Sequence, residues 1–367
     1  MLHVTEAMLE ALAIGAGILG TGGGGNPFVG KLEALTHLRA GRTITVVPID
    51  DVPTDAFVTT VGNMGAPIVS NERINRGDEP LRAMRALERH LGRSFTHVIA
   101  SEIGGINSMA PLIVSAQTGL PVIDGDGMGR AFPELQMDTF TIYGIAPTPA
   151  AIADPRGHEV VFTGIEDAQT LERYARVVCV EMGASSGYAF PPMTGSDVRR
   201  TAVPNTLLLA IRIGEAVMAA RGGSANPVDA ALAVAGGQRL FHGKITDVSR
   251  RLVGGFARGV LHLEGISSDR GRAMVIDFQN ENLIARDETS AVLAVVPDLI
   301  CIVDQDTAEP ITTEILRYGM RVVVIAIPAT EMLKTPEALR VVGPAAFGYP
   351  DVAFVPMPGV FGSGMSG

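Results

Sequence analysis

Residues 96–119 read THVIASEIGGINSMAPLIVSAQTG, and this stretch determines the fold class of the N-terminal part. Its first five residues, 96–100, have the length and apolar composition of a buried strand. The glycine-rich segment 101–107 is typical of a loop. Residues 108–118 then favour a helix, which Gly119 ends. A strand, a loop and a helix in this order are typical of a parallel α/β sheet.

The same alternation continues on both sides of this stretch. Residues 43–49 and 56–61 favour strands, residues 79–91 favour an amphipathic helix, and residues 120–123 favour another buried strand. Further along, residues 140–143 and 159–163 have a β-like composition. We therefore predict an α/β N-terminal domain with a largely parallel sheet.

The pattern changes after residue 237. Residues 244–265 alternate and contain a Gly-Gly pair, as a bulged hairpin does. A series of short strands follows, with one helix near residues 311–318. We predict an α/β ligand-binding domain over residues 1–165, on which helices within residues 166–236 pack. A mostly-β domain is predicted over residues 237–367.

Residues 20–27, GTGGGGNP, form the second feature of interest. Glycines without a Cβ adopt positive φ and let the backbone approach a ligand closely. Asn26 is a good N-cap and Pro27 suits the first helical position, so a helix is expected over residues 28–40. A helix N-terminus favours an anion or a developing oxyanion. The residues predicted to contact a ligand here are Gly22, Gly23, Gly24, Gly25 and Asn26.

Two nucleotide-binding motifs overlap this region without their usual context. Gly15-x-Gly17-x-x-Gly20 matches the dinucleotide fingerprint, but residues 5–14 before it favour a helix instead of a strand. Gly25-x-x-x-x-Gly30-Lys31 resembles a P-loop, but Leu32 replaces the Ser or Thr that binds magnesium. A nucleotide- or phosphate-binding enzyme, and a plain tight turn between packed helices, both stay open as alternatives.

Composition narrows the class of protein. The chain has 367 residues, of which 47% are hydrophobic and 19% charged, so large cores are expected and disorder is not. The net charge of −10 without a basic cluster argues against nucleic acid as a partner. The two cysteines, the absence of a signal-peptide pattern and the absence of a long apolar run predict a cytoplasmic protein without a membrane span. The apolar content also suits a homo-oligomer.

Polar residues follow three of the predicted strands, in loops 62–67, 101–107 and 124–134. Parallel strands end at the same edge of a sheet, and ligands of α/β sheets bind beyond that edge. We therefore expect one crevice surrounded by polar side chains. The residues placed there are Asn63, Glu102, Asn107, Asp124, Asp126, Arg130 and Glu134.

Several of these stretches together resemble a known family. They include SEIGGINS (101–108), DGDGMGRAFPELQM (124–137), DFQNENLIA (277–285) and VGPAAFGYP (342–350). On these motifs, and on GTGGGGNP, the chain is similar to the S-methyl thiohydantoin desulfurase family, long a domain of unknown function. The resemblance implies an α/β domain followed by a β-rich domain. It also implies chemistry on a hydantoin-like ring, in the company of hydantoinase/oxoprolinase-type proteins.

The implied reaction replaces a methylthio group on a ring carbon by oxygen, and it needs a base, an acid and groups that hold the ring. Glu102, which follows a buried strand and precedes two glycines, is the first candidate for the base. Asp124 and Asp126 are candidates for the second proton carrier. Arg130 is expected to bind a ring carbonyl or carboxylate in bidentate fashion, and Asn107 to donate to the ring. The amides of the four glycines are expected to bind developing negative charge.

Each of these residues also has a structural interpretation. Asp124 and Asp126 can shape an Asx-turn, and Arg130 can pair with Glu134 four residues on. Glu102 can brace the glycine loop, and Asn107 can act as a plain helix cap.

Other chemistries are weaker predictions. Cys179 as a nucleophile is the second mechanism, although an apolar cysteine on a helix usually only packs. No local pattern directs a histidine to Ser185 or Ser186. The histidines lack metal-ligand spacing, so no cofactor is predicted, with a carboxylate-bound Mg²⁺ or Ca²⁺ left open. A non-catalytic subunit that binds a hydantoinase-type enzyme is the alternative to a small-molecule enzyme.

Overall fold

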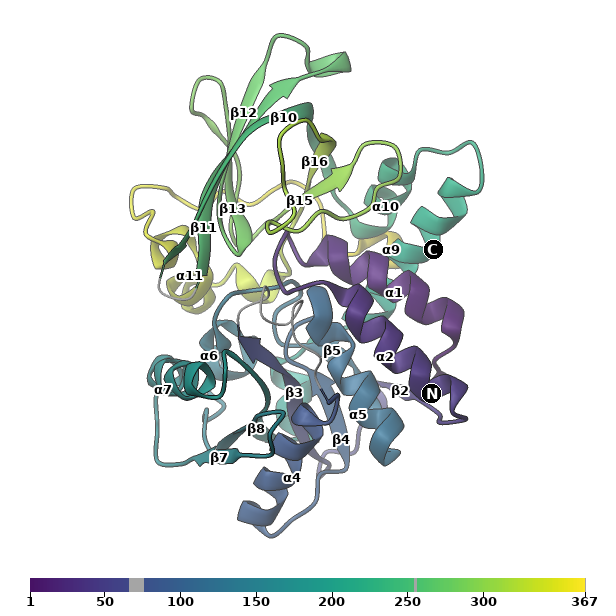
Figure 1. Ribbon diagram of the computed structural model, residues 1–367, viewed down its shortest axis with the longest axis vertical. Coiled ribbons are helices and arrows are strands. Elements are labelled where there is room, and N and C mark those ends of the chain that lie inside the picture. The colour runs from purple at the N-terminus through teal and green to yellow at the C-terminus, as the bar shows by residue number, and fades with distance from the viewer. Residues whose placement is uncertain (66–75, 254–255, 367) are drawn as a thin grey trace. The chain divides into compact units, whose positions relative to one another are not determined.

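A computed structural model of the chain describes residues 1–65, 76–253 and 256–366 (Figure 1). The chain folds into two compact units. The N-terminal unit comprises residues 1–9, 25–128 and 134–207. The C-terminal unit comprises residues 10–24, 129–133 and 208–367. Within the described residues, no helix is both long enough and apolar enough to cross a membrane.

The N-terminal unit is built on a sheet with a parallel centre. Its four central strands, in spatial order, are β2 (Thr45–Pro48), β5 (Val122–Asp126), β4 (His97–Ala100) and β3 (Phe57–Gly65). Antiparallel strands extend both edges: β1 (Leu2–His3) beside β2, and β8 (Ser185–Thr194), β6 (Ala150–Ala153) and β7 (Glu159–Phe162) beyond β3. The short β9 (Val203–Pro204) pairs with β5. The predicted α/β class with a parallel core is confirmed.

Helices cover both faces of this sheet (Figure 1). One face carries α4 (Glu79–Leu91) and α5 (Ala110–Thr118), and α2 (Pro27–Arg39) packs on α5. The other face carries α6 (Thr139–Ile142), α7 (Ala168–Glu181) and α8 (Gly195–Thr201). Successive residues of β8 point to opposite faces of the sheet and therefore contact different helices. A Cβ on Gly187 would strike the backbone at the start of α4, whereas Tyr188 packs in the cluster that includes α7.

Some local predictions about this unit are confirmed and others are wrong. The Asn26 side chain accepts a hydrogen bond from the Phe28 amide at 2.9 Å, so it caps α2 as predicted. Residues 62–65, predicted as a loop, belong to β3 because they pair with residues 185–188 of β8. The remaining loop residues 66 and 67 lie outside the described residues. Residues 140–143 are not strand-like, because the Asp138 side chain caps α6 there.

The C-terminal unit contains an antiparallel seven-stranded sheet. In spatial order the strands are β14 (Val292–Val295), β13 (Glu281–Asp287), β12 (Ala273–Gln279), β11 (Phe256–Gly265), β10 (Gln238–Val253), β16 (Arg321–Ile327) and β15 (Leu299–Asp304). The sheet curls into a half-barrel, since the Asn282 side chain on β13 donates to the Ile300 carbonyl on β15 at 2.9 Å. Its helices are α1 (Glu6–Leu19, from Glu10 onward), α9 (Thr206–Arg221), α10 (Pro227–Ala235) and α11 (Pro336–Val342).

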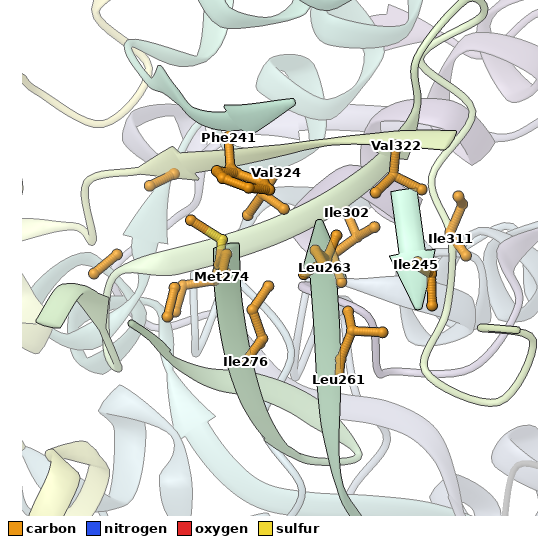
Figure 2. Packing of buried hydrophobic residues seen from close by; sticks show 14 of the residues in the cluster. Phe241, Ile245, Leu261, Leu263, Met274, Ile276, Ile302, Ile311, Val322 and Val324 are labelled. Atoms are coloured by element: carbon orange, nitrogen blue, oxygen red, sulfur yellow. The ribbon is translucent and has the colours of Figure 1, made fainter. Parts of the chain in front are cut away.

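The concave side of the half-barrel holds the core of this unit. Figure 2 shows Phe241, Leu263, Met274 and Val324 pointing into one apolar interior from different strands. The predicted hairpin is confirmed, and its strands have a register shift between Ile245 and Asp247. The Gly-Gly pair on which the prediction depended, residues 254–255, lies outside the described residues. The helix predicted near residues 311–318 is wrong, because this segment forms turns. The mostly-β class of the C-terminal part is confirmed.

Two glycines let α1 and α9 approach each other closely. A Cβ on Gly15 would lie 1.8 Å from the Ala210 carbonyl oxygen, and a Cβ on Gly214 would lie 1.8 Å from that of Ala11. We expect Gly214→Ala to lower the free energy of unfolding by roughly 1–3 kcal/mol, because the two backbones must move apart. Urea denaturation measures the change.

Gly222 is the matched control for this substitution. It follows α9, and no atom lies within 3.5 Å of a Cβ built there. Gly222→Ala should therefore leave the protein unchanged or slightly more stable, because alanine restricts the unfolded chain. A Gly214→Ala variant as stable as Gly222→Ala would contradict the close-packing explanation.

Candidate functional site

Three of the predicted site residues form one hydrogen-bonded group at the carboxyl end of β4. Glu102 is only 6% exposed, and its Oε1 accepts a hydrogen bond from Asn107 Nδ2 at 2.7 Å. The same amide donates to the Asn63 carbonyl at 3.0 Å, and Asn107 Oδ1 accepts from the Asn63 amide at 2.7 Å. Both amide hydrogens of Asn107 are thus engaged within the unit, which orients the Glu102 carboxylate.

The interpretation of Asn107 as a helix cap is wrong. The residue lies within a 3₁₀ turn, Gly105–Ser108, and the cap of α5 is Met109, which makes no side-chain capping bond. The glycine pair before Asn107 allows the tight turn, because Gly105 has a φ of 73°. The turn brings Asn107 back toward β3, where its amide meets the Asn63 backbone instead of a helix terminus.

Asp126 connects the ends of β4 and β5. Its Oδ2 accepts hydrogen bonds from the Ile103 amide at 2.8 Å and the Met128 amide at 3.0 Å. The Gly127 amide donates to the Ser101 carbonyl at 2.9 Å, next to the same junction. The contact with Met128 is the Asx-turn that the sequence suggested, and the contact with Ile103 adds a link to the residue after Glu102.

Asp124 and Glu134 have different local partners. Asp124 Oδ1 accepts from the Leu207 amide at 3.0 Å, and its backbone carbonyl accepts from the Asn205 amide at 3.0 Å. Asp124 therefore holds the chain that leads into α9. The Glu134 carboxylate accepts from the Gln136 side-chain amide.

Two further buried titratable residues of this unit, Tyr188 and Asp138, were not predicted from the sequence. Tyr188 packs over β3, where a Cβ on Gly62 would lie 2.4 Å from its hydroxyl oxygen. Burial, and then the negative charge of Glu102, raise the pKa of Tyr188, so its hydroxyl remains protonated. Asp138 makes a smaller contribution that also raises the pKa of Tyr188. Tyr188 has no local sequence signal, because its position follows from the pairing of β8 with β3.

Asp138 is fully buried, and burial raises its pKa to about 7. Its Oδ1 accepts from the Thr141 amide at 2.7 Å and from the Thr141 hydroxyl at 3.0 Å. These hydrogen bonds favour the ionised form, but they do not outweigh the loss of solvation. Its Oδ2 is buried without a hydrogen-bond partner among the described residues. A carboxyl group of this kind can hold or release a proton near neutral pH.

The raised pKa of Asp138 makes stability depend on pH. The folded protein keeps this proton up to about pH 7, whereas the unfolded chain releases it near the ordinary value of 3.8. The free energy of unfolding must therefore fall as pH rises between these values. In the wild type, we expect this titration to lower the free energy of unfolding by about 2–3 kcal/mol from roughly pH 5 to pH 8, and in Asp138→Asn we expect this contribution to be absent. Urea denaturation at several pH values measures it.

Asp167 provides the matched control for this prediction. It caps α7 through Thr170 as Asp138 caps α6, but it is exposed, and hydrogen bonds from Thr170 lower its pKa. Asp167→Asn should keep the wild-type decrease in stability over this pH range. If Asp138→Asn retains the same decrease, the carboxyl group does not titrate near pH 7.

In the C-terminal unit, buried polar groups hold the glycine-rich loop. The Gly23 amide donates to the Gly20 carbonyl at 2.8 Å, and the Gly24 amide donates to Glu281 Oε1 at 3.2 Å. The Gly22 carbonyl accepts from the Thr313 amide at 2.7 Å. A Cβ on Gly23 would lie 2.0 Å from Glu281 Oε1, so the glycine is required for this contact. The amides of Gly23 and Gly24 are thus engaged inside the unit.

Arg130 belongs to the same network. Its side chain has no exposed surface, and Nη1 donates to the carbonyls of Pro297 at 2.9 Å and Asp298 at 3.0 Å. Nε donates to the Ala131 carbonyl at 3.0 Å, and Nη2 donates to the Thr21 hydroxyl at 2.9 Å. The guanidinium therefore links the residue before the glycines to the start of β15.

The predicted residues therefore fall into two groups, one in each unit. The N-terminal unit holds Gly25, Asn26, Asn63, Glu102, Asn107, Asp124, Asp126 and Glu134. The C-terminal unit holds Gly22, Gly23, Gly24 and Arg130. Glu281 and Asn282, which the sequence analysis did not select, bind the glycine loop through Gly24 and through the Thr21 carbonyl. The polar run QNEN between two apolar strands is the signal that could have revealed them.

The alternative chemistries find little structural support. Gly15 and Gly17 lie inside α1, and Lys31 lies inside α2 with its ammonium over the Phe28 ring, so neither nucleotide motif has the required strand and loop. Burial raises the pKa of the Cys179 thiol and raises that of Cys301 to about 12, which disfavours a thiolate. In the part of the chain that the structure describes, no three His, Cys, Asp or Glu residues gather as a metal site.

Two family models match this chain, one over its N-terminal part and one over its C-terminal part. The model of the S-Me-THD-like N-terminal domain matches residues 7–164, and that of the S-Me-THD-like C-terminal domain matches residues 166–357. A crystal structure of a protein from Chromobacterium violaceum is similar, with 26% sequence identity and a TM-score of 0.79. The similarity covers 97% of this chain and 100% of that chain. No curated protein matches the sequence. Because the two domain models together span almost the whole chain, the protein belongs to the S-methyl thiohydantoin desulfurase family.

Proposed function

We propose that the protein hydrolyses an S-methyl thiohydantoin-like ring and releases methanethiol. Family membership supports the substrate class. The observation that carries the chemical proposal is the buried carboxylate of Glu102, held by the Asn107 amide at 2.7 Å beyond the end of β4. Ligands of α/β sheets bind beyond the carboxyl ends of the parallel strands, and a catalytic carboxylate at that edge suits a hydrolase.

The proposed reaction consumes one water molecule and involves no oxidation or reduction. The water oxygen adds to the ring carbon that carries the methylthio group, and its proton passes to Glu102. The electron pair of the C=N bond moves to the ring nitrogen, which takes up the proton held by Glu102, and a tetrahedral adduct with one hydroxyl group results. The C–S bond then breaks while the adduct's hydroxyl group loses its proton, and an acid delivers one proton to sulfur. The products are methanethiol and a ring carbonyl, and the proton lost by the hydroxyl group restores the acid. Glu102 acts as base in the first step.

The proton for the leaving sulfur needs a second group. Asp124 and Asp126 were the sequence candidates, and each uses a carboxylate oxygen to bind backbone amides of the unit, which gives it a structural role. Asp138 is better suited as an acid, because burial raises its pKa to about 7 and leaves it partly protonated at neutral pH. We therefore assign the acid role to Asp138, and to Asp126 the role of positioning the loop that carries Glu102.

Turnover by the purified protein tests the proposal. The protein is incubated with an S-methyl thiohydantoin in ¹⁸O-labelled water, and released thiol is trapped with a chromogenic disulfide. We expect thiol release without added ATP and one ¹⁸O atom in the ring carbonyl. A folded protein that releases no methanethiol contradicts the proposal, as does one that releases it only when a hydantoinase-type protein is added.

A further inference from the structure

The half-barrel of the C-terminal unit has a pocket on its surface that the proposed reaction does not use. Its volume is about 410 Å³, which is within the range of small-molecule sites. Residues of β10, β11, β12 and β13 line it, together with Phe347 and Tyr349 from the segment after α11. The pocket is lined by three arginines, Arg250, Arg251 and Arg258. This local positive charge contrasts with the net charge of −10 of the whole protein.

Two of these arginines face each other directly. In the antiparallel pairing of β10 with β11, Arg251 is opposite Arg258. Like charges at directly opposite positions of a sheet repel each other and destabilise it. Both side chains are exposed, and neither has a hydrogen bond or an ion pair with another of the described residues. The guanidinium donors of both are therefore available to an external partner.

The acidic residue of the pocket does not neutralise this pair. Asp277, opposite Val260 in the next strand, forms an ion pair with Arg286 at 2.6 Å. Arg250 is anchored separately, with Nη2 donating to the carbonyls of Thr313 and Leu316. The lining thus keeps an excess of positive charge at Arg251 and Arg258.

Neutral groups complete the lining. Gln279 lies opposite Arg258 and can donate or accept a hydrogen bond. Burial, and then the charge of Asp277, raise the pKa of Tyr349 to about 12, so its phenol keeps its proton at neutral pH. Phe347, on the same side of the pocket, offers an apolar ring surface.

We propose that this pocket binds a small organic anion through a carboxylate or phosphate group held between Arg251 and Arg258. The planar guanidinium groups match the geometry of both anions, and a bound anion removes the repulsion between the two strands. The ring of Phe347 contacts the apolar part of the ligand. No residue of the Glu102 group is among the residues that line the pocket, and the proposal does not depend on the proposed reaction.

Calorimetric titration of the full-length protein tests the proposal at constant ionic strength. The probes are phenyl phosphate, benzoate and neutral benzamide. We expect saturable binding of at least one anion in the millimolar range or tighter, and no binding of benzamide. The stronger of the two anions identifies the preferred group. In Arg251→Gln/Arg258→Gln the dissociation constant should rise at least about tenfold.

A matched control removes the same charge elsewhere on the unit. Arg270 and Arg317 are exposed residues outside the pocket, so Arg270→Gln/Arg317→Gln should bind the anion as the wild type does. Without ligand, the pocket variant should melt at a higher temperature than this control, because the strand repulsion is gone. Equal loss of binding in both variants, or no binding of either anion to the wild type, would overturn the proposal. The single substitution Arg258→Gln serves if the double variant does not fold.

Discussion

Glu102→Gln is expected to lower kcat/KM for methanethiol release by roughly 10²–10⁴-fold, the usual contribution of a positioned general base. In the wild type, Asn107 Nδ2 donates to Glu102 Oε1 at 2.7 Å. Glutamine has the same size as glutamate and keeps an oxygen that can accept this hydrogen bond. The substitution therefore removes the ability to take a proton and preserves the packing. Initial rates of thiol release and a melting curve of each variant measure the two effects separately.

The control for Glu102 is another buried carboxylate of the same unit. Glu88 is 8% exposed, and its Oε1 accepts from the Phe95 amide at 2.8 Å. Glu88→Gln should leave kcat/KM within about twofold, because this carboxylate braces the end of α4 and the chain after it. Wild-type activity in Glu102→Gln would show that the base is a different group. The proposed reaction itself would still stand on the release of methanethiol.

Arg130→Met is expected to lower the free energy of unfolding by about 3–5 kcal/mol. Methionine fills most of the space but donates no hydrogen bond. The carbonyls of Ala131, Pro297 and Asp298 then lose a donor in a fully buried position. An unsatisfied buried acceptor costs roughly 1–3 kcal/mol, partly offset here because a buried charge is removed.

Urea denaturation followed by far-ultraviolet circular dichroism measures this loss. Arg130→Lys should recover little of it, because an ammonium cannot reproduce the planar fork that reaches several acceptors. The exposed Arg270 is the control, and Arg270→Met should change stability by less than about 0.5 kcal/mol. An Arg130→Met protein within about 1 kcal/mol of the wild type would contradict the bracing role.

Local sequence patterns predicted those elements whose determinants lie within a few residues. Asn26 and Pro27 start α2 because the cap and the fixed φ act on the adjacent turn. The hairpin of β10 and β11 follows from its own alternation. Segments whose composition differs from their final structure were predicted less well. Residues 62–65 have the composition of a loop, yet they form a strand because β8 supplies hydrogen-bond partners from more than a hundred residues away.

The candidate site was predicted only in part, because some of its contacts depend on residues that are distant in the sequence. Glu102 was identified because it follows a buried strand and precedes two glycines, at the edge where α/β sheets bind ligands. Its contact with Asn107 depends on a turn that returns the amide to β3, and no spacing rule predicts that. Asp138 was missed because residues 140–143 after it have a β-like composition, so the sequence indicated neither the helix that it caps nor its burial. Only its complete burial raises its pKa.

The sequence by itself determined the two-part α/β and β-rich architecture and the family. The spacing of apolar residues and the order of the motifs can both be read directly from the sequence. The tertiary structure alone decided which groups the polar side chains meet. Arg130 binds carbonyls near residue 297 and Glu281 binds the Gly24 amide, although the sequence places each pair far apart. Buried polar groups must find partners inside the fold, and strand pairing selects those partners over long distances in the chain.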